Sequence, residues 1–253
     1  MSLLSFSNNI IKKVLGKSNI CSAVIMAAGS SKRMGGENKV LIKINDIPVV
    51  VHTLMVFQNN DSINEIIVVA REDSIEAIAK LCDLYDITKV TKIIAGGNTR
   101  TESVLNGITA VSKYASLIAI HDAARPCVDD DVIQKAINLA AVYKAAAPSI
   151  PITSTVKKVH NNQIIETVDR ESLVEIQTPQ VFNADLIKYA ITKVINESIP
   201  VTDDCMAVEL SGINVYTSKG SVNNLKITNK EDILVAQTIL SKRISGEGET
   251  ICE

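Results

Sequence analysis

The residues best suited to chemistry lie in the loop at 27–39, which directly follows a short apolar run. Gly29 and its small neighbours allow backbone N–H groups to approach a ligand closely. Three cations follow within eight residues, namely Lys32, Arg33 and Lys39. Such a loop suits a polyphosphate. It is not a P-loop, which needs Gly-Lys-Ser/Thr after four spacers, and it is not GxGxxG, because Ser31 occupies the second glycine position. On composition alone, an ordinary turn with solvated charges stays open as the alternative.

A second candidate group ends the apolar run at 116–122 and contains His121, Asp122 and Arg125. In open α/β sheets, ligands bind outside the carboxyl ends of the strands. An Asp at that position can hold a metal or a sugar hydroxyl, and an Arg can bind phosphate through two N–H groups. The alternative is a capping Asp and a surface Arg. No Ser or Cys is clearly paired with His121, which gives a hydrolase triad little support.

Three smaller features add to these groups. Gly96, Gly97 and Ser103 flank another strand-to-helix junction, where contacts to a base or ribose are expected. The acidic pair after Thr202, Asp203 and Asp204, is most simply interpreted as the N-cap of a helix. Lys226 stands alone near the end of the chain. None of these features decides the function by itself.

The elements that must position these residues alternate along the chain. Apolar runs typical of buried strands occur at 20–27, 65–71, 92–97 and 116–122. Helical spacing follows them at 47–58, 74–85, 101–114 and 130–144, with Thr101 as the expected N-cap of the third helix. Further helices are expected at 184–197, 203–211 and 230–244, with a strand near 213–217. This alternation predicts an α/β fold with a doubly wound, mostly parallel sheet.

The alternation stops at residues 152–178, which are rich in Thr, Val and Ile with polar residues between them. A turn at 160–163 predicts a β-hairpin arm inserted into a single domain that spans 20–253. An exposed arm with apolar residues is prone to aggregation unless something covers it. A second subunit is the simplest cover, so we expect a homodimer.

Composition excludes several classes of protein. The 253 residues carry a net charge of −2, with no Trp and three Phe, which disfavours a nucleic-acid binder. No apolar run is long enough for a transmembrane helix. Five scattered cysteines without a CxxC pair indicate reduced thiols and a cytoplasmic location rather than a zinc site. The basic stretch at 1–19 fits a signal peptide poorly; we expect a loosely packed extension, with a membrane-surface helix as the alternative and no stable membrane association.

In their order and spacing, these motifs resemble those of the 2-C-methyl-D-erythritol 4-phosphate cytidylyltransferase family. The matching blocks are AAGSSKRM (27–34), GGNTRTESVLNG (96–107), HDAARP (121–126), PITSTVK (151–157), TVDRESL (167–173), QTPQVF (177–182), TDD (202–204) and NLKIT (224–228). They cover nearly the whole chain from about residue 20 to residue 244. The resemblance implies a Rossmann-like nucleotidyltransferase fold.

The resemblance also implies a reaction, in which the phosphate of 2-C-methyl-D-erythritol 4-phosphate attacks the α-phosphorus of CTP and pyrophosphate leaves. The nucleophile is already ionised, so catalysis rests on alignment and charge neutralisation. By motif position, Arg33 and Lys39 hold the triphosphate, and Lys226 joins them at the α-phosphate. Mg²⁺ bridges the phosphates, with Asp122 as a candidate protein ligand.

The family pattern also assigns the remaining contacts. The nucleotide-binding set is Ala27, Ala28, Gly29, Gly96, Gly97 and Ser103. The set facing the second substrate is Asp122, Arg125, Thr155, Arg170 and Thr178. The resemblance places Arg170, also counted as catalytic, in the partner subunit's site, where it binds the substrate phosphate; the alternative is a surface charge on the arm.

Three departures from the family pattern affect fine geometry, namely Ser31, Ser154 and Val174. Two other functions stay open. One is a cytidylyltransferase for a different polyol phosphate such as ribitol 5-phosphate, since few substitutions retune a pocket. The other is a nucleotide-binding protein without catalysis, which fold alone does not exclude.

Overall fold

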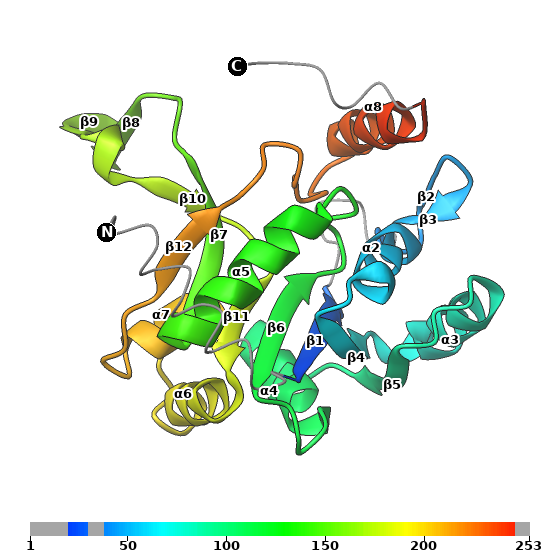
Figure 1. Ribbon diagram of the computed structural model, residues 1–253. Coiled ribbons are helices and arrows are strands. Elements are labelled where there is room, and N and C mark those ends of the chain that lie inside the picture. The colour runs from blue at the N-terminus through cyan, green and yellow to red at the C-terminus, as the bar shows by residue number, and fades with distance from the viewer. Residues whose placement is uncertain (1–19, 30–37, 246–253) are drawn as a thin grey trace, which may run out of the picture.

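The computed structural model describes residues 20–29 and 38–245. Its main sheet has eight strands in the order β10-β7-β11-β6-β1-β4-β5, with β12 paired to β7 (Figure 1). The strands are β1 (Cys21–Ala27), β4 (Ile63–Ala70), β5 (Val90–Ala95), β6 (Leu117–Asp122), β7 (Ala145–Pro151), β10 (Val174–Ile176), β11 (Gln180–Asn183) and β12 (Tyr216–Lys219). The short strands β2 (Lys43–Ile44) and β3 (Ile47–Pro48) pair separately. Arg33, Ser31 and the extension at 1–19 lie outside the described residues.

The sheet is parallel through its centre. Strand β1 pairs in parallel with β4 on one side and with β6 on the other, and β4 pairs in parallel with β5. Strand β11 is antiparallel to both β6 and β7. Nearly every residue of β1, β4 and β6 is buried, as expected for parallel strands that are covered on both faces. The predicted doubly wound, mostly parallel sheet is confirmed.

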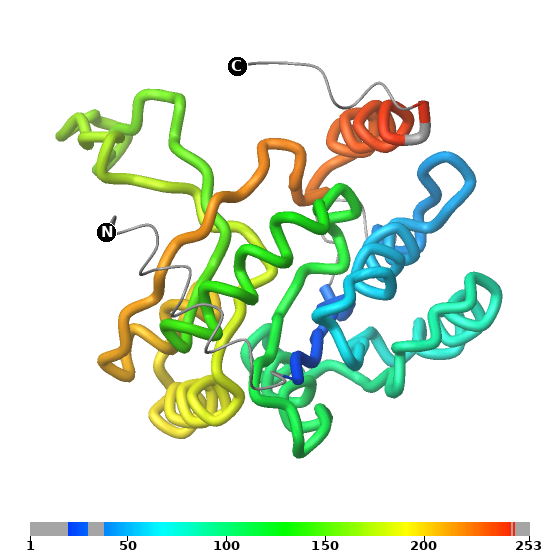
Figure 2. The backbone as a smooth tube through the Cα atoms, viewed as in Figure 1, coloured from blue at the N-terminus to red at the C-terminus, as the bar shows by residue number. Residues whose placement is uncertain are grey.

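Helices cover both faces of the sheet (Figures 1 and 2). One apolar core includes side chains from α2 (Val49–Asn59), α3 (Ile75–Leu84), α5 (Asp130–Tyr143) and α8 (Glu231–Ser245). The other includes side chains from α4 (Arg100–Ala110), α6 (Ala184–Asn196) and α7 (Asp204–Glu209). Two single-turn 3₁₀ helices are η2 (Glu72–Ser74) and η3 (Arg170–Ser172). None of the helices in the described residues is long and apolar enough to span a bilayer.

Some element boundaries differ from those expected. The N-cap of α4 is Thr99, whose side chain accepts a hydrogen bond from the backbone of Glu102, so the expected cap at Thr101 is wrong. Thr101 already lies in the first helical turn, where its side chain cannot cap. The cap expected at the start of α7 is confirmed, because Asp203 accepts from the Met206 N–H at 2.9 Å. Strand β12 begins later than the expected strand at 213–217, because its range follows from pairing with β7.

The arm is present and projects from one end of the molecule (Figure 2). Strands β8 (Val156–His160) and β9 (Gln163–Val168) form a separate two-stranded sheet. The two residues between them, Asn161 and Asn162, both have positive φ, as a tight hairpin turn requires. The returning chain pairs with β7 through β10, so Thr178, at the expected end of the arm, is buried against the main sheet.

Candidate active site

The candidate residues that follow β1, β5 and β6 meet at one edge of the sheet. Strands β1, β4, β5 and β6 are parallel, so their carboxyl ends all emerge at this edge. A Cβ added to Gly96 would lie 2.6 Å from the Cβ of Ala28, which shows how closely the loops after β5 and β1 approach. The glycine is required for this approach, because a real Cβ would clash there.

Ser103 shapes the loop after β5 instead of pointing freely into it. Its hydroxyl accepts from the Gly97 N–H at 3.0 Å and donates to the Thr99 carbonyl at 2.9 Å, and the residue is buried. Of the expected nucleotide-binding set, Ala28, Gly96, Gly97 and Ser103 therefore lie together.

The carboxylate of Asp122 lies among several cations at this edge. The Lys226 Nζ lies 2.9 Å from this carboxylate and the Arg125 Nε lies 3.5 Å from it. Burial would raise the pKa of Asp122, but the attraction of Lys226, Arg125 and Arg100 outweighs it and lowers the pKa to about 2. The carboxylate therefore stays ionised at physiological pH and holds Lys226 in a fixed position.

Lys39 and Lys226 come together from opposite ends of the chain. The Lys39 Nζ donates to the carbonyl of Ile227 at 2.7 Å, one residue beyond Lys226. Lys226 keeps 39% of its side chain exposed while its Nζ is bound to Asp122, so this lysine is not enclosed by the protein. Arg125 is buried instead, and its Nη1 donates to the Asn224 carbonyl at 2.6 Å.

Thr178 connects two neighbours on β6. Its hydroxyl accepts from the Asp122 N–H at 3.2 Å and lies 3.0 Å from the Nδ1 of His121. Burial dominates the pKa of His121 and lowers it to about 3, with the Arg125 charge acting in the same direction and Asp122 opposing it. The imidazole is therefore neutral and packs against Phe57 with ring centroids 4.9 Å apart. With so low a pKa and no exposure, His121 would be a poor general base.

Several polar residues of this region lie outside the sets that the family pattern assigned to the two substrates. The Arg100 guanidinium forms two 2.7 Å hydrogen bonds with the carboxylate of Asp204, which is fully buried. The backbone N–H of Asp204 donates to the side chain of Gln180. Asn224 is also fully buried and donates to the carbonyl of Thr178. Their place inside the matching blocks was the only available signal, because each is a common polar residue.

Two expected residues lie outside the cluster around Asp122. Thr155 is exposed at the base of the arm. Arg170 is exposed in η3, and its guanidinium donates to the carbonyl of Thr153 in the same chain. Arg33 belongs to the stretch that the structure does not describe.

The described residues offer few metal ligands. They contain no group of three or more His, Cys, Asp or Glu placed to hold an ion. At the sheet edge Asp122 is a carboxylate already bound by cations. This donor set fits a divalent ion held mainly by phosphate oxygens, with one protein carboxylate at most.

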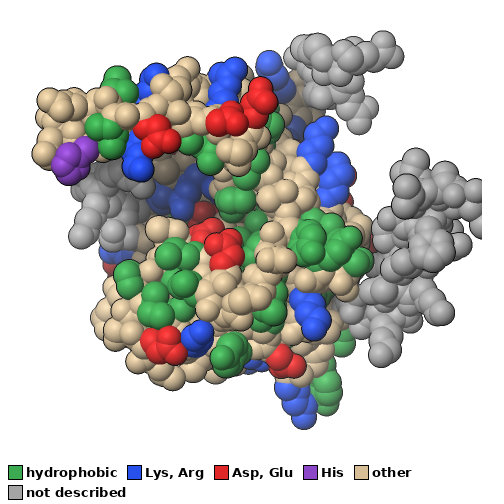
Figure 3. Space-filling view, turned by 90° about the vertical axis from the view of Figure 1, so that its left-hand side faces the viewer, with side chains coloured by type: hydrophobic (Ala, Val, Ile, Leu, Met, Phe, Trp, Pro, Cys, Tyr) green, Lys and Arg blue, Asp and Glu red, His purple; other side chains and the backbone are tan. Residues whose placement is uncertain are grey.

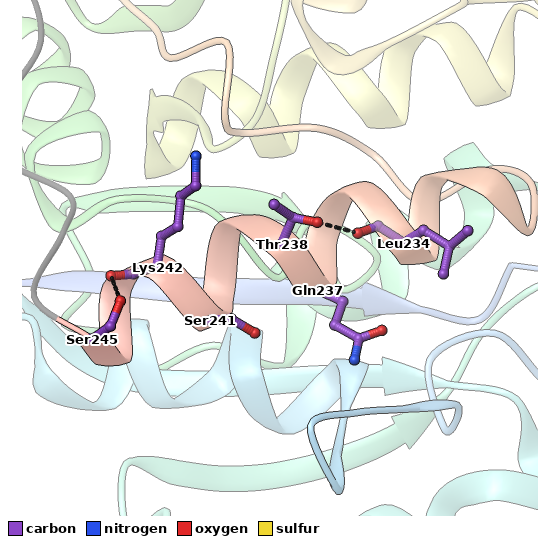
Figure 4. A pocket seen from close by; sticks show the side chains of 6 residues that line it. All are labelled: Leu234, Gln237, Thr238, Ser241, Lys242 and Ser245. Carbon is purple, nitrogen blue, oxygen red and sulfur yellow. Dashed lines mark hydrogen bonds between the residues drawn. The ribbon is translucent and has the colours of Figure 1, made fainter.

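A groove of about 550 Å³ runs along α8 (Figure 4). Its lining residues all belong to this one helix: Leu234, Gln237, Thr238, Ser241, Lys242 and Ser245. It contains none of the residues around Asp122, so the groove is separate from the charged cluster.

Comparison with known proteins identifies the family. The family model for 2-C-methyl-D-erythritol 4-phosphate cytidylyltransferase matches residues 21–242. The chain belongs to this family.

Similar members of the 2-C-methyl-D-erythritol 4-phosphate cytidylyltransferase family align over most of the chain. The enzyme from Halalkalibacterium halodurans is 41% identical over 223 residues, covering 88% of this chain and 97% of its own length. The one from Clostridium botulinum strain 657 is 42% identical, covering 87% and 97%. The crystal structure of 4-diphosphocytidyl-2C-methyl-D-erythritol synthase from Anaerococcus prevotii superposes with a TM-score of 0.80 at 30% identity, covering 88% and 97%.

As a member of this family, the chain is a nucleotidyltransferase. Its reaction is the CTP-dependent transfer of a cytidylyl group to 2-C-methyl-D-erythritol 4-phosphate in the non-mevalonate route to isoprenoids.

Proposed function

We propose that this cytidylyl transfer takes place at the carboxyl edge of the sheet, beside Asp122. The observation that carries the proposal is the partly exposed side chain of Lys226, whose Nζ is held 2.9 Å from the buried Asp122 carboxylate. A fixed cation at this edge is suited to the charge that develops on a phosphoryl group during transfer.

The chemistry is an in-line displacement at phosphorus. An ionised oxygen of the 2-C-methyl-D-erythritol 4-phosphate phosphate forms a bond to the α-phosphorus of CTP. The bond from that phosphorus to the bridging oxygen breaks, and pyrophosphate leaves with the electron pair. No general base is needed, which agrees with the burial of His121 and with its low pKa, which makes it a weak base.

The residues divide between the two substrates. We assign the cytosine and ribose to the loops carrying Ala27, Ala28, Gly29, Gly96 and Gly97, which Ser103 shapes. We assign the phosphates to Arg33, Lys39 and Lys226. The second substrate lies near Asp122, Arg125, Thr155 and Thr178.

A divalent ion, Mg²⁺ in our proposal, neutralises phosphate charge when it is bound. The phosphates would hold most of its coordination sphere, and Asp122 is the candidate protein ligand. The chain's own contribution is to keep that carboxylate ionised, because the surrounding cations hold the pKa of Asp122 low.

The arm supports a homodimer in this proposal. Four apolar side chains are exposed on the arm and its return: Val159, Ile164, Ile165 and Val174. Figure 3 shows hydrophobic side chains exposed on the arm among charged ones. A partner subunit would cover them, and Arg170 would then bind the substrate phosphate in the partner's site. The cytoplasmic location stays a prediction.

Pyrophosphate release tests the reaction. The protein is incubated with CTP and Mg²⁺, and either 2-C-methyl-D-erythritol 4-phosphate or ribitol 5-phosphate is added. We expect release with the first substrate alone. Release with ribitol 5-phosphate alone would keep the mechanism and change the substrate. If folded protein releases no pyrophosphate with either substrate, the result would favour nucleotide binding without catalysis.

A further inference from the structure

The segment at 220–228, called the strap here, carries Lys226 across the edge of the sheet. The strap leaves β12 and precedes α8. Its side chains include the fully buried Asn224 and Ile227, with Lys226 between them. Lys226 thus lies two residues after one buried side chain and directly before another.

Asn224 fastens the first side of the strap. Its Nδ2 donates to the Thr178 carbonyl at 2.9 Å and to the Gln177 Oε1 at 3.2 Å. Its own backbone carbonyl accepts from the Arg125 Nη1 at 2.6 Å. One asparagine therefore ties the strap to the segment before β11 and to the residues after β6.

Gln177 supports this attachment. It is buried, its Nε2 donates to the Ser221 carbonyl at 2.8 Å, and its Oε1 accepts from the Ser221 N–H at 3.3 Å. A Cβ added to Gly220 would lie 2.7 Å from the Gln177 Oε1, so the strap passes very close to this side chain.

Ile227 fastens the second side. Its N–H donates to the Ala124 carbonyl at 2.8 Å and its own carbonyl accepts from the Lys39 Nζ at 2.7 Å. The backbone is therefore held on both sides of Lys226, which leaves only the lysine side chain to be oriented. Asp122 then orients it through the 2.9 Å ion pair.

A cation lowers a reaction barrier most when it is already in place, because no reorganisation is then needed as charge develops. A lysine side chain has considerable rotamer freedom, and displacement of its backbone would take the ammonium away from the phosphates. We propose that Asn224 is a positioning residue, which acts on cytidylyl transfer by fixing the strap that presents Lys226. This inference rests on the proposed role of Lys226.

The test is a double-mutant cycle measured by steady-state pyrophosphate release with CTP, Mg²⁺ and 2-C-methyl-D-erythritol 4-phosphate. We expect Asn224→Ala to lower kcat by about 10- to 100-fold, a scale known for small misplacements of reacting groups. The matched control is Asn223→Ala, which changes the adjacent, exposed asparagine of the strap and should leave kcat within about twofold of the unaltered chain.

The decisive comparison is Asn224→Ala combined with Lys226→Ala. If Asn224 acts through Lys226, the double variant should be no slower than Lys226→Ala alone. The proposal would be overturned if the fold-losses in kcat of the two single variants multiplied in the double variant. It would also be overturned if Asn224→Ala were as fast as the Asn223→Ala control. If Asn224→Ala fails to fold by circular dichroism, Asn224→Leu carries the same cycle, because it keeps a similar side-chain volume and removes the Nδ2 donor without burying a new charge.

The proposed function fails in a different way. No turnover by the unaltered chain, or full activity of Lys226→Ala, would contradict the role of Lys226 itself. Slow Asn224 and Lys226 variants with independent effects would leave that role intact and reject only the positioning by Asn224.

Discussion

At the scale of single residues, the carboxylate of Asp122 lies between opposing effects. Burial disfavours its charge, and the nearby cations favour it. Lys226 makes the shortest ion pair with it and is also the more exposed of the two partners. A cation that is both held and accessible is what a phosphoryl-transfer site needs, so the first prediction concerns this lysine.

Lys226→Ala should lower kcat by about two to three orders of magnitude, the usual scale for losing a preorganised charge contact. Steady-state pyrophosphate release measures the effect. Asp122 keeps Arg125 as a partner, so the fold should survive. Lys219→Ala, at an exposed position of β12, is the control and should leave kcat unchanged. Near-normal activity in a folded Lys226→Ala protein would contradict the assignment.

The burial of His121 makes stability depend on pH. Its pKa is lowered from 6.5 to about 3 in the folded chain. As pH falls, the imidazole is therefore protonated in the unfolded chain before it is protonated in the folded chain. This stabilising contribution is complete above about pH 6.5 and is lost as pH falls toward 3. Relative to His121→Asn, the unaltered chain should lose about 1.4 kcal/mol of unfolding free energy per pH unit between pH 6 and pH 4.

Urea unfolding at several pH values measures this difference. His52 also has a pKa lowered by burial, but it is present in both proteins and cancels in the comparison. Parallel stability curves for the two proteins would show that His121 is not held neutral.

At the scale of elements, the two-stranded arm buries too little of its own surface to be stable by itself. Within residues 20–29 and 38–245, strands β8 and β9 pair only with each other, and nearly all of their residues are exposed. An isolated two-stranded hairpin is marginally stable in water, which is a physical reason to expect a partner on it.

Mixing two inactive variants tests whether the arm completes the partner's site. Arg170→Ala and Lys226→Ala should each be slow alone. If Arg170 acts in the partner's site, a mixed dimer has one site carrying both changes and one intact site. Random exchange should therefore restore roughly a quarter of the unaltered activity. Light scattering should show a dimer throughout, and no recovery after proven exchange would place Arg170 in its own subunit's site.

At the scale of the whole molecule, the site depends on ties between distant segments. Lys39 reaches the carbonyl of Ile227, and Arg100 binds Asp204 across two helix N-termini. Burial would lower the pKa of Arg100, but Asp204 outweighs burial and raises it, so the arginine stays charged. The pair connects α4, behind the nucleotide loop, to α7.

Arg100→Gln should lower the free energy of unfolding by about 3 kcal/mol, because it leaves the Asp204 carboxylate buried without its ion-pair partner. The double variant Arg100→Gln with Asp204→Asn removes both charges and should regain most of that loss. Denaturant unfolding of the three variants measures the coupling. Additive losses would show that the pair contributes little.

The sequence by itself determined the fold class, because apolar strands and amphipathic helices alternate with periods set by local backbone geometry. It determined the family and reaction too, since the motifs lie in blocks of fixed order. Local turn chemistry placed the hairpin at Asn161 and Asn162. The error at Thr101 was equally local, because a helix can begin one or two residues earlier without changing its apolar pattern.

Tertiary structure alone decided what the charged residues contact. Nothing near Lys226 in the sequence shows that it pairs with Asp122, or that Asn224 holds the strap. Polar side chains form these contacts only after packing has removed water and brought strand ends to one edge. Their energies depend on burial and on partners distant in the sequence, which no local pattern records.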